Sequence, residues 1–180
     1  FINLWNRPAF VIAYVLPAQL GYWAVELLTA FIAALTCFVV YRAAQRRGMD
    51  NAAVSIVLLA FQPFFFMLSF SALVEPLAAL LVAASLHALF SRGYVRSAVY
   101  ASLIPLTRLE LSLLLGIWAI HYLRQGRWRP GLVLPLGLIA WNIAGALMTG
   151  DPLYLYNNIF TGAERFYDAK GFWHYPSTFI

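Results

Sequence analysis

Long uncharged stretches dominate the chain and alternate with short segments that hold its charged residues. Residues 52–74 and 130–149 contain no charged side chain, and residues 22–41 are interrupted only by Glu26. Each stretch reaches the roughly 20 residues that an α-helix needs to cross a hydrocarbon core about 30 Å thick. The pattern therefore predicts helices that span a membrane.

Shorter apolar runs complete the pattern. Residues 76–90 predict a helix that returns across the membrane after a turn at residues 69–75. Residues 9–20, which contain Pro17, are short for a span and are typical of a helix lying in the membrane interface.

The arginines indicate how these helices are oriented. Eight of the twelve Lys and Arg residues fall in three loops: Arg42, Arg46 and Arg47; Arg92 and Arg96; Arg124, Arg127 and Arg129. The positive-inside rule predicts that all three loops are cytoplasmic. The chain must then cross the membrane an even number of times between consecutive loops, or turn back within it.

Residues 97–123 are predicted to form a short hairpin instead of a single span. A single span would bury Arg108 and Glu110 near the bilayer centre, where each charge costs about 2.5–3.5 kcal/mol on insertion scales. Pro105 favours a turn, because a proline inside a helix removes a backbone hydrogen bond. We expect the tip, residues 107–110, to be recessed in the outer leaflet and to line a watery cavity.

The predicted fold is therefore an all-α, polytopic transmembrane bundle. It has about six membrane helices, including the short hairpin, together with the interfacial helix, and residues 1–180 form a single domain. The composition agrees, because 63% of residues are hydrophobic and 11% are charged, against about 25% charged in soluble domains. The net charge of +5 does not indicate a nucleic-acid partner, since the basic residues form no continuous stripe. The chain begins at Phe1 and ends without a polar tail, so we expect a fragment of a longer membrane domain.

Most ionisable groups outside the arginine loops are predicted to lie at the outer face. They are Arg7, Glu26, Glu75, Arg108, Glu110, Asp151, Glu164, Arg165, Asp168, Lys170 and His174. Ionisable groups at membrane depth usually mark a pathway or a reaction site. No glycine-rich phosphate loop, nucleophile elbow or metal-spaced histidine pair occurs in the sequence.

Several of these groups allow both a structural and a functional interpretation. Glu75 precedes Pro76, so it either caps the returning helix or serves as a general base or metal ligand. Arg108 and Glu110 either pair with another helix, or the planar fork of Arg108 binds a phosphate. For Arg7, the residues alone indicate an anchor at the lipid headgroups.

Three short motifs occur in an order that resembles a known family. They are Ser-Ala-Leu-Val-Glu-Pro-Leu at 71–77, Leu-Thr-Arg-Leu-Glu at 106–110 and Gly-Asp-Pro-Leu-Tyr at 150–154. Together they resemble the GT-C superfamily of integral-membrane glycosyltransferases, and Trp-Asn-Arg-Pro at 5–8 is similar to a further element of that family. The chain departs from the family pattern at Leu109, where a proline is usual, and at Val74, which precedes the glutamate.

The resemblance implies transfer of a sugar from a polyprenyl-phosphate-linked donor to a glycan, lipid or protein acceptor. The protein would be a multi-pass protein of a bacterial inner membrane or an ER membrane, with its active face outward. The resemblance assigns the donor phosphate to Arg108 and Arg7, and catalytic roles to Glu75 and Glu110. Glu75 would be a second acid near the acceptor or near a divalent metal ion.

The resemblance also implies contacts with the substrates and a missing group. The candidate substrate-binding residues are Trp5, Asn6, Tyr154, His174 and Tyr175; interfacial anchoring explains the aromatic ones equally well. The family places its catalytic base in a first outer loop, upstream of residue 1, so we expect this fragment to be inactive alone. The alternatives are an envelope-polysaccharide polymerase or ligase, and a transporter whose pathway is lined by Glu26, Glu75, Arg108 and Glu110.

Overall fold

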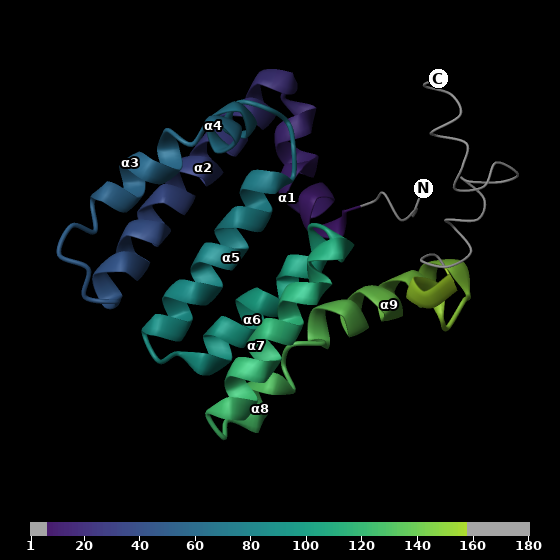
Figure 1. The fold of residues 1–180 in the computed structure, drawn as a ribbon. Coiled ribbons are helices and arrows are strands. Elements are labelled where there is room, and N and C mark those ends of the chain that lie inside the picture. Colours follow the sequence, from purple (N-terminus) through teal and green to yellow (C-terminus); the bar gives the residue numbers. More distant parts are fainter. Residues whose placement is uncertain (1–6, 158–180) are drawn as a thin grey trace, which may run out of the picture. The chain divides into compact units, whose positions relative to one another are not determined.

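The structure is a computed structural model that describes residues 7–157, and these residues form helices and turns without a strand. In chain order the elements are α1 (Pro8–Gln19), α2 (Tyr22–Arg46), α3 (Val54–Ala60), α4 (Pro63–Ser69), α5 (Glu75–Phe90), α6 (Tyr94–Leu103), the 3-10 helices η1 (Ile104–Leu106) and η2 (Leu109–Leu111), α7 (Ser112–Arg124), α8 (Trp128–Gly131) and α9 (Leu136–Thr149) (Figure 1). The predicted all-α class is confirmed.

The chain divides into two compact units. One comprises Arg7–Leu138, and the other contains the described residues from Ile139 onward, so α9 belongs to both. The elements α1 to α8 and both 3-10 helices lie in the first unit. The single domain predicted for residues 1–180 stays a prediction.

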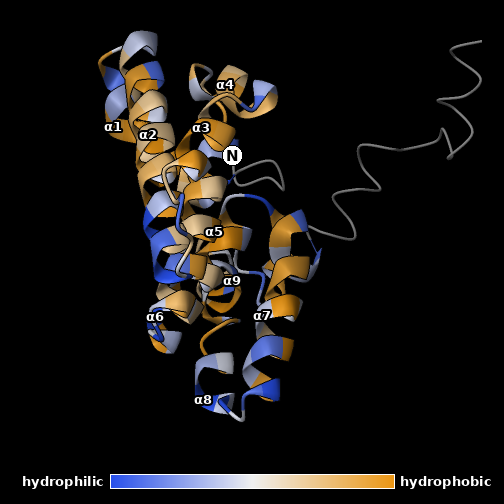
Figure 2. Cartoon of the chain, turned by 60° about the vertical axis from the view of Figure 1, so that its left-hand side comes forward, coloured by the Kyte–Doolittle hydropathy of each residue, from blue (hydrophilic) through white to orange (hydrophobic). Residues whose placement is uncertain are grey.

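Two helical stretches are long and apolar enough to cross a membrane. They are Tyr22–Arg46, which is α2, and Trp128–Thr149, which covers α8 and α9. Hydrophobic residues cover most of α2 and α5, whereas hydrophilic residues gather toward helix ends and turns (Figure 2). Large apolar side chains of α2, such as Phe31 and Phe38, are exposed, as expected for a surface that meets lipid. The larger number of about six membrane helices stays a prediction.

The prediction of one continuous helix over residues 52–74 is wrong. The structure has two seven-residue helices there, α3 and α4, separated at Phe61 and Gln62. Pro63 is responsible, because it cannot donate a backbone hydrogen bond and is well suited to begin a new helix. The Gln62 side chain accepts a hydrogen bond from the Phe65 amide and so caps α4. Each helix is about 10 Å long, too short to span a bilayer alone.

Small and hydroxyl side chains let α2 and α5 pack side by side (Figure 1). Ala33 of α2 and Ala78 and Ala83 of α5 are buried, and small residues allow helix backbones to approach closely. Thr29 and Thr36 of α2 are also buried, and each satisfies its hydroxyl by donating to the carbonyl four residues earlier. Burial of these polar groups therefore leaves no donor unpaired.

The predicted hairpin between the second and third arginine loops is present. Its arms are α6 and α7, and its tip consists of η1, η2 and the residues between them. Buried Ser97 of α6 joins three helices, since its hydroxyl lies 3.2 Å from that of Ser85 in α5 and accepts from the Trp118 indole of α7 at 3.3 Å. This network holds the hairpin against α5.

Gly137, at the start of α9, packs so closely against α6 that a larger side chain there should destabilise the protein. A Cβ at this position would lie 1.8 Å from the Ser102 carbonyl oxygen of α6, whereas a Cβ at Gly116 of α7 meets nothing within 4 Å. We therefore expect Gly137→Ala to lower the free energy of unfolding by about 1–3 kcal/mol, as in other overpacked interiors. Gly116→Ala should leave it unchanged or raise it by up to about 1 kcal/mol. Thermal unfolding in detergent measures both, and equal melting temperatures would contradict the contact.

Candidate functional site

An ion pair between two predicted site residues forms the centre of the candidate site. Arg108 donates from Nη1 to Oε1 of Glu75 at 3.0 Å, although the two residues are 33 positions apart in the sequence. Their side chains are 37% and 23% exposed. The pair is therefore partly buried and still accessible to a ligand, as a reaction site requires.

Glu75 is placed by the rigid start of α5. It is the first residue of the helix, and Pro76 follows it within the first turn. Val74 on one side and Pro76 on the other are buried, so the backbone at Glu75 is fixed. The N-cap residue is Val74, and no side chain caps the helix. The Glu75 carboxylate therefore interacts favourably with the helix dipole from the first turn, while it accepts its hydrogen bond from Arg108.

Arg108 is placed by the interruption at the hairpin tip. Helix α6 ends before Pro105, and the buried Thr107 side chain donates to the Ile104 carbonyl at 2.6 Å. Arg108 then adopts an extended backbone, with φ −150° and ψ 120°, between the two 3-10 helices. This single extended residue turns the side chain out of the helical path. Pro105 and Thr107 thus aim Arg108 at the start of α5.

Glu110 contributes more weakly than Glu75. Its Oε2 lies 3.8 Å from Nε of Arg108, and its side chain is 76% exposed. An ion pair with this exposure contributes about 0–1 kcal/mol. Arg108 and Glu110 thus approach each other at the tip, but the closer partner of Arg108 is Glu75.

Glu75 also carries the unusual feature of the site. Its second carboxylate oxygen, Oε2, is buried and has no hydrogen-bond partner among the described residues. A buried acceptor without a partner costs about 1–3 kcal/mol or more for a charged group. Such a group fits a site whose remaining partner is a substrate hydroxyl or a cation.

Of the other predicted site residues, the structure describes Arg7 and Tyr154. Arg7 precedes α1 with an extended backbone and forms no ion pair with a carboxylate of residues 7–157. Tyr154 is in the second unit, where it is 3% exposed and packs edge-on against Trp141; burial raises the pKa of its phenol. The predictions for Trp5, Asn6, His174 and Tyr175 lie outside the described residues.

A structural role that sequence reasoning missed belongs to Asn142. Its side-chain amide donates to the Pro152 carbonyl at 3.0 Å, and its carbonyl oxygen accepts from the Leu155 amide at 2.9 Å. Asp151 accepts from the Leu153 amide at 3.0 Å within the same segment. The Gly-Asp-Pro-Leu-Tyr motif is thus folded back onto α9 by side-chain hydrogen bonds. The sequence offered one indication of this role, since Asn142 is a polar residue inside an apolar run and such a side chain needs hydrogen-bond partners when it is buried.

No group of three His, Cys, Asp or Glu side chains in residues 7–157 is placed to hold a metal ion. The divalent metal implied by the family resemblance stays a prediction. Comparisons with known protein families, with curated proteins and with solved structures find no match to this chain. The function must therefore be argued from the site itself.

Proposed function

We propose that the chain is part of a membrane glycosyltransferase that uses a polyprenyl-phosphate-linked sugar donor. The observation that carries the proposal is the Glu75–Arg108 pair at the tip of a short hairpin. A charged pair in an apolar helical chain needs a reason, because ionisable groups at membrane depth are costly. A phosphate that sits at headgroup depth supplies that reason.

The chemistry of Arg108 suits a departing phosphate. Glu75 binds one nitrogen of the guanidinium and Glu110 approaches a second, while a guanidinium has five N–H donors in a planar fork. The remaining donors face no carboxylate of the described residues, so they are available to phosphate oxygens. Planar, two-point contact with phosphate is the task for which arginine is best suited.

The proposed reaction is a displacement at the anomeric carbon of the sugar. The bond from that carbon to the phosphate oxygen breaks, and a bond to the acceptor oxygen forms. The acceptor loses its proton to a base, a role that the family resemblance gives to an acidic residue of the first outer loop. Negative charge grows on the departing polyprenyl phosphate, and Arg108 stabilises it there. Glu75 positions Arg108 and balances its charge when no donor is bound.

A donor comparison tests the proposal. Membranes containing the full-length protein are incubated with a polyprenyl-monophosphate sugar or with a polyprenyl-diphosphate oligosaccharide, and radiolabelled product is measured. We expect transfer from the monophosphate donor. Transfer from the diphosphate donor alone would replace the proposal with a polysaccharide polymerase or ligase.

Accessibility of position 75 gives an independent prediction. A cysteine is introduced as Glu75→Cys in a background with Cys37→Ala, and membrane-impermeant maleimides are applied to each side of sealed vesicles. We expect labelling from one side only, because the proposed donor approaches from a single leaflet. Labelling from both sides would indicate alternating access and hence a transporter.

A further inference from the structure

A second charged site lies at the opposite end of the first unit from Glu75. It is a cavity of about 500 Å³ whose lining includes Arg46, Arg47, Arg92 and Arg127. These residues come from all three arginine loops, so the three loops lie at one end of the unit. Phe90, the last residue of α5, also lines the cavity. Because α5 has 16 residues, it separates the two sites by about 24 Å.

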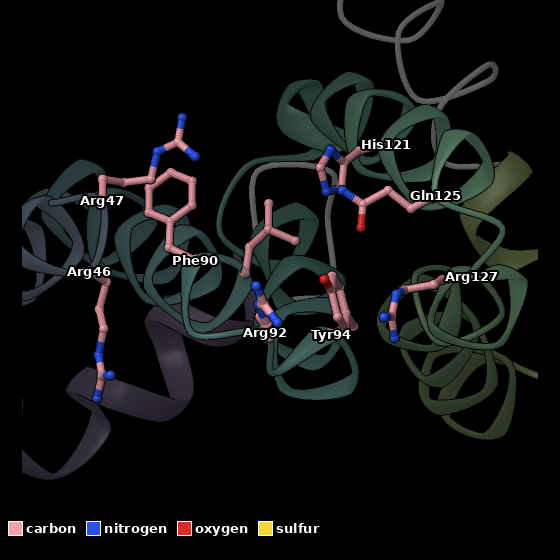
Figure 3. A pocket seen from close by; sticks show the side chains of 9 residues that line it. Arg46, Arg47, Phe90, Arg92, Tyr94, His121, Gln125 and Arg127 are labelled. Atoms are coloured by element: carbon pink, nitrogen blue, oxygen red, sulfur yellow. The ribbon is translucent and has the colours of Figure 1, made fainter.

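The cavity has an excess of positive charge that the protein does not neutralise. Both ion pairs among residues 7–157 involve Arg108, so the cavity arginines have no described carboxylate partner. Two of them are held in place by aromatic rings, since the Arg47 guanidinium lies 4.9 Å from the Phe90 ring centroid and that of Arg127 lies 4.0 Å from Tyr94 (Figure 3). Positive groups that are ordered and unpaired predict an anionic ligand.

The backbone at Arg92 supports the same conclusion. Arg92 has φ 58°, and among residues 7–157 no other non-glycine residue has a positive φ. That region favours glycine, because other residues have a Cβ that is crowded there. An arginine stands at a position where glycine would fold more easily, and its side chain lines the cavity near Tyr94 (Figure 3).

We propose that this cavity binds the phosphate headgroup of an anionic phospholipid. Basic pockets between membrane helices on the side of the positive loops are suited to such headgroups. The volume lies within the range of about 300–1,000 Å³ typical of ligand sites. The helices beside the cavity expose large apolar side chains, among them Val95 and Leu123, along which acyl chains can lie. The inference does not depend on the glycosyltransferase proposal.

The cavity favours a lipid over a soluble nucleotide. The aromatic rings of the lining already stack with arginines of the protein, since Arg47 lies over Phe90 and Arg127 lies over Tyr94, which leaves less ring surface for a nucleotide base. A lipid headgroup needs only cations near the membrane surface and a hydrophobic border, and both are present. Gln125 and His121, which also line the cavity, add polar contacts for a glycerol or phosphate oxygen.

Lipid retention tests the proposal with closely matched variants. The full-length protein is reconstituted in nanodiscs of phosphatidylglycerol and phosphatidylcholine, and the lipids retained after extraction are measured by native mass spectrometry. The test variant is Arg47→Gln with Arg127→Gln. The control is Arg42→Gln with Arg129→Gln, which removes the same charge from arginines that also lie over rings, those of Phe38 and Trp128, but do not line the cavity.

We expect the test variant to lose about tenfold or more of the preference for phosphatidylglycerol, because each basic group near the surface contributes to anionic-lipid binding. The control should stay within about twofold of wild type, because its arginines act only through the general surface potential. Equal losses in both variants would overturn the proposal. Equal retention of phosphatidylglycerol and phosphatidylcholine by wild type, together with saturable binding of inorganic phosphate that the test variant loses, would also overturn it, in favour of a soluble anion.

A glycine substitution removes a cavity arginine without the risk of misfolding. Arg92→Gly removes a cavity cation and places glycine where φ is positive, so its melting temperature should equal or exceed that of wild type. We expect this stable variant to retain less phosphatidylglycerol, by about threefold to tenfold. Unchanged retention in a folded Arg92→Gly protein would contradict the site.

Discussion

Replacement of Arg108 by alanine is expected to reduce the proposed sugar transfer by about 10²–10³-fold in the full-length protein, the loss seen when one preorganised donor to a developing charge is removed. The reason is geometric. Arg108 stands on an extended residue between two 3-10 helices and is aimed at the start of α5. No other described arginine forms an ion pair that would place it at this end of α5. Initial rates with the monophosphate donor measure the effect.

The controls for Arg108→Ala separate catalysis from folding. The side chain is 37% exposed, so its removal should leave the amount of protein in the membrane close to wild type. Arg108→Lys keeps the charge but loses the planar fork, and we expect it to recover only a small part of the activity. Arg96→Ala, which removes a charge from the opposite end of the unit, should transfer sugar at nearly the wild-type rate. Full activity in Arg108→Ala would refute the phosphate assignment.

The hydrophobic pattern was a good guide to the helices and a poor guide to their interruptions. Residues 22–41 were predicted to form a span, and α2 begins at the predicted residue and continues to Arg46. The charge of Arg42 did not end the helix, because long basic side chains reach water while their stems lie along the helix. In residues 52–74, by contrast, Pro63 divides the apolar run. An uncharged run indicates that a segment lies in an apolar environment. Whether that segment is one continuous helix depends on its backbone hydrogen bonds, which Pro63 interrupts.

The hairpin shows how charge can predict topology. Arg108 and Glu110 would carry a high free-energy cost at the centre of a bilayer, and this cost predicted a turn near Pro105. The structure has η1 and η2 at that place. The partner of Arg108 was not predictable in the same way. Glu75 and Arg108 are 33 residues apart, and their contact depends on the lateral packing of α5 against the hairpin. That packing arises from buried residues such as Ser85 and Ser97, which a pattern of charges does not reveal.

The arginine loops were predicted to share one side of a membrane, but the cavity that they form was not predicted. Counting charges treats each loop as a label for topology. The cavity exists because the ends of α2, α5 and α7 lie near one another, so that Arg47, Arg92 and Arg127 line the same space. The sequence does not show that the three loops lie close together in space, and this proximity is what forms the cavity.

Removal of the Glu75 carboxylate is the second change expected to have a large effect. We expect Glu75→Ala to reduce transfer by about 10²-fold, because a displacement of about 1 Å at a reacting group has an effect of this size. Without Glu75, the one carboxylate left to Arg108 among residues 7–157 is that of Glu110, whose oxygen lies 3.8 Å away on a side chain that is 76% exposed. Glu110→Ala removes the weaker and more exposed partner of the same arginine, and we expect a smaller loss, within about threefold of wild type, because an exposed ion pair contributes little.

A double-variant cycle distinguishes positioning by Glu75 from an independent role. If Glu75 acts through Arg108, the double variant Glu75→Ala with Arg108→Ala should be no slower than Arg108→Ala alone, because residues that act as a unit are non-additive. If Glu75 instead meets the acceptor through its buried and unpartnered Oε2, the two losses should multiply. Glu75→Gln sharpens the distinction, since its amide can still accept a hydrogen bond from Arg108 but cannot take a proton. Recovery of activity in Glu75→Gln would therefore identify Glu75 as a positioning residue, and a loss equal to that of Glu75→Ala would indicate that the negative charge itself is required.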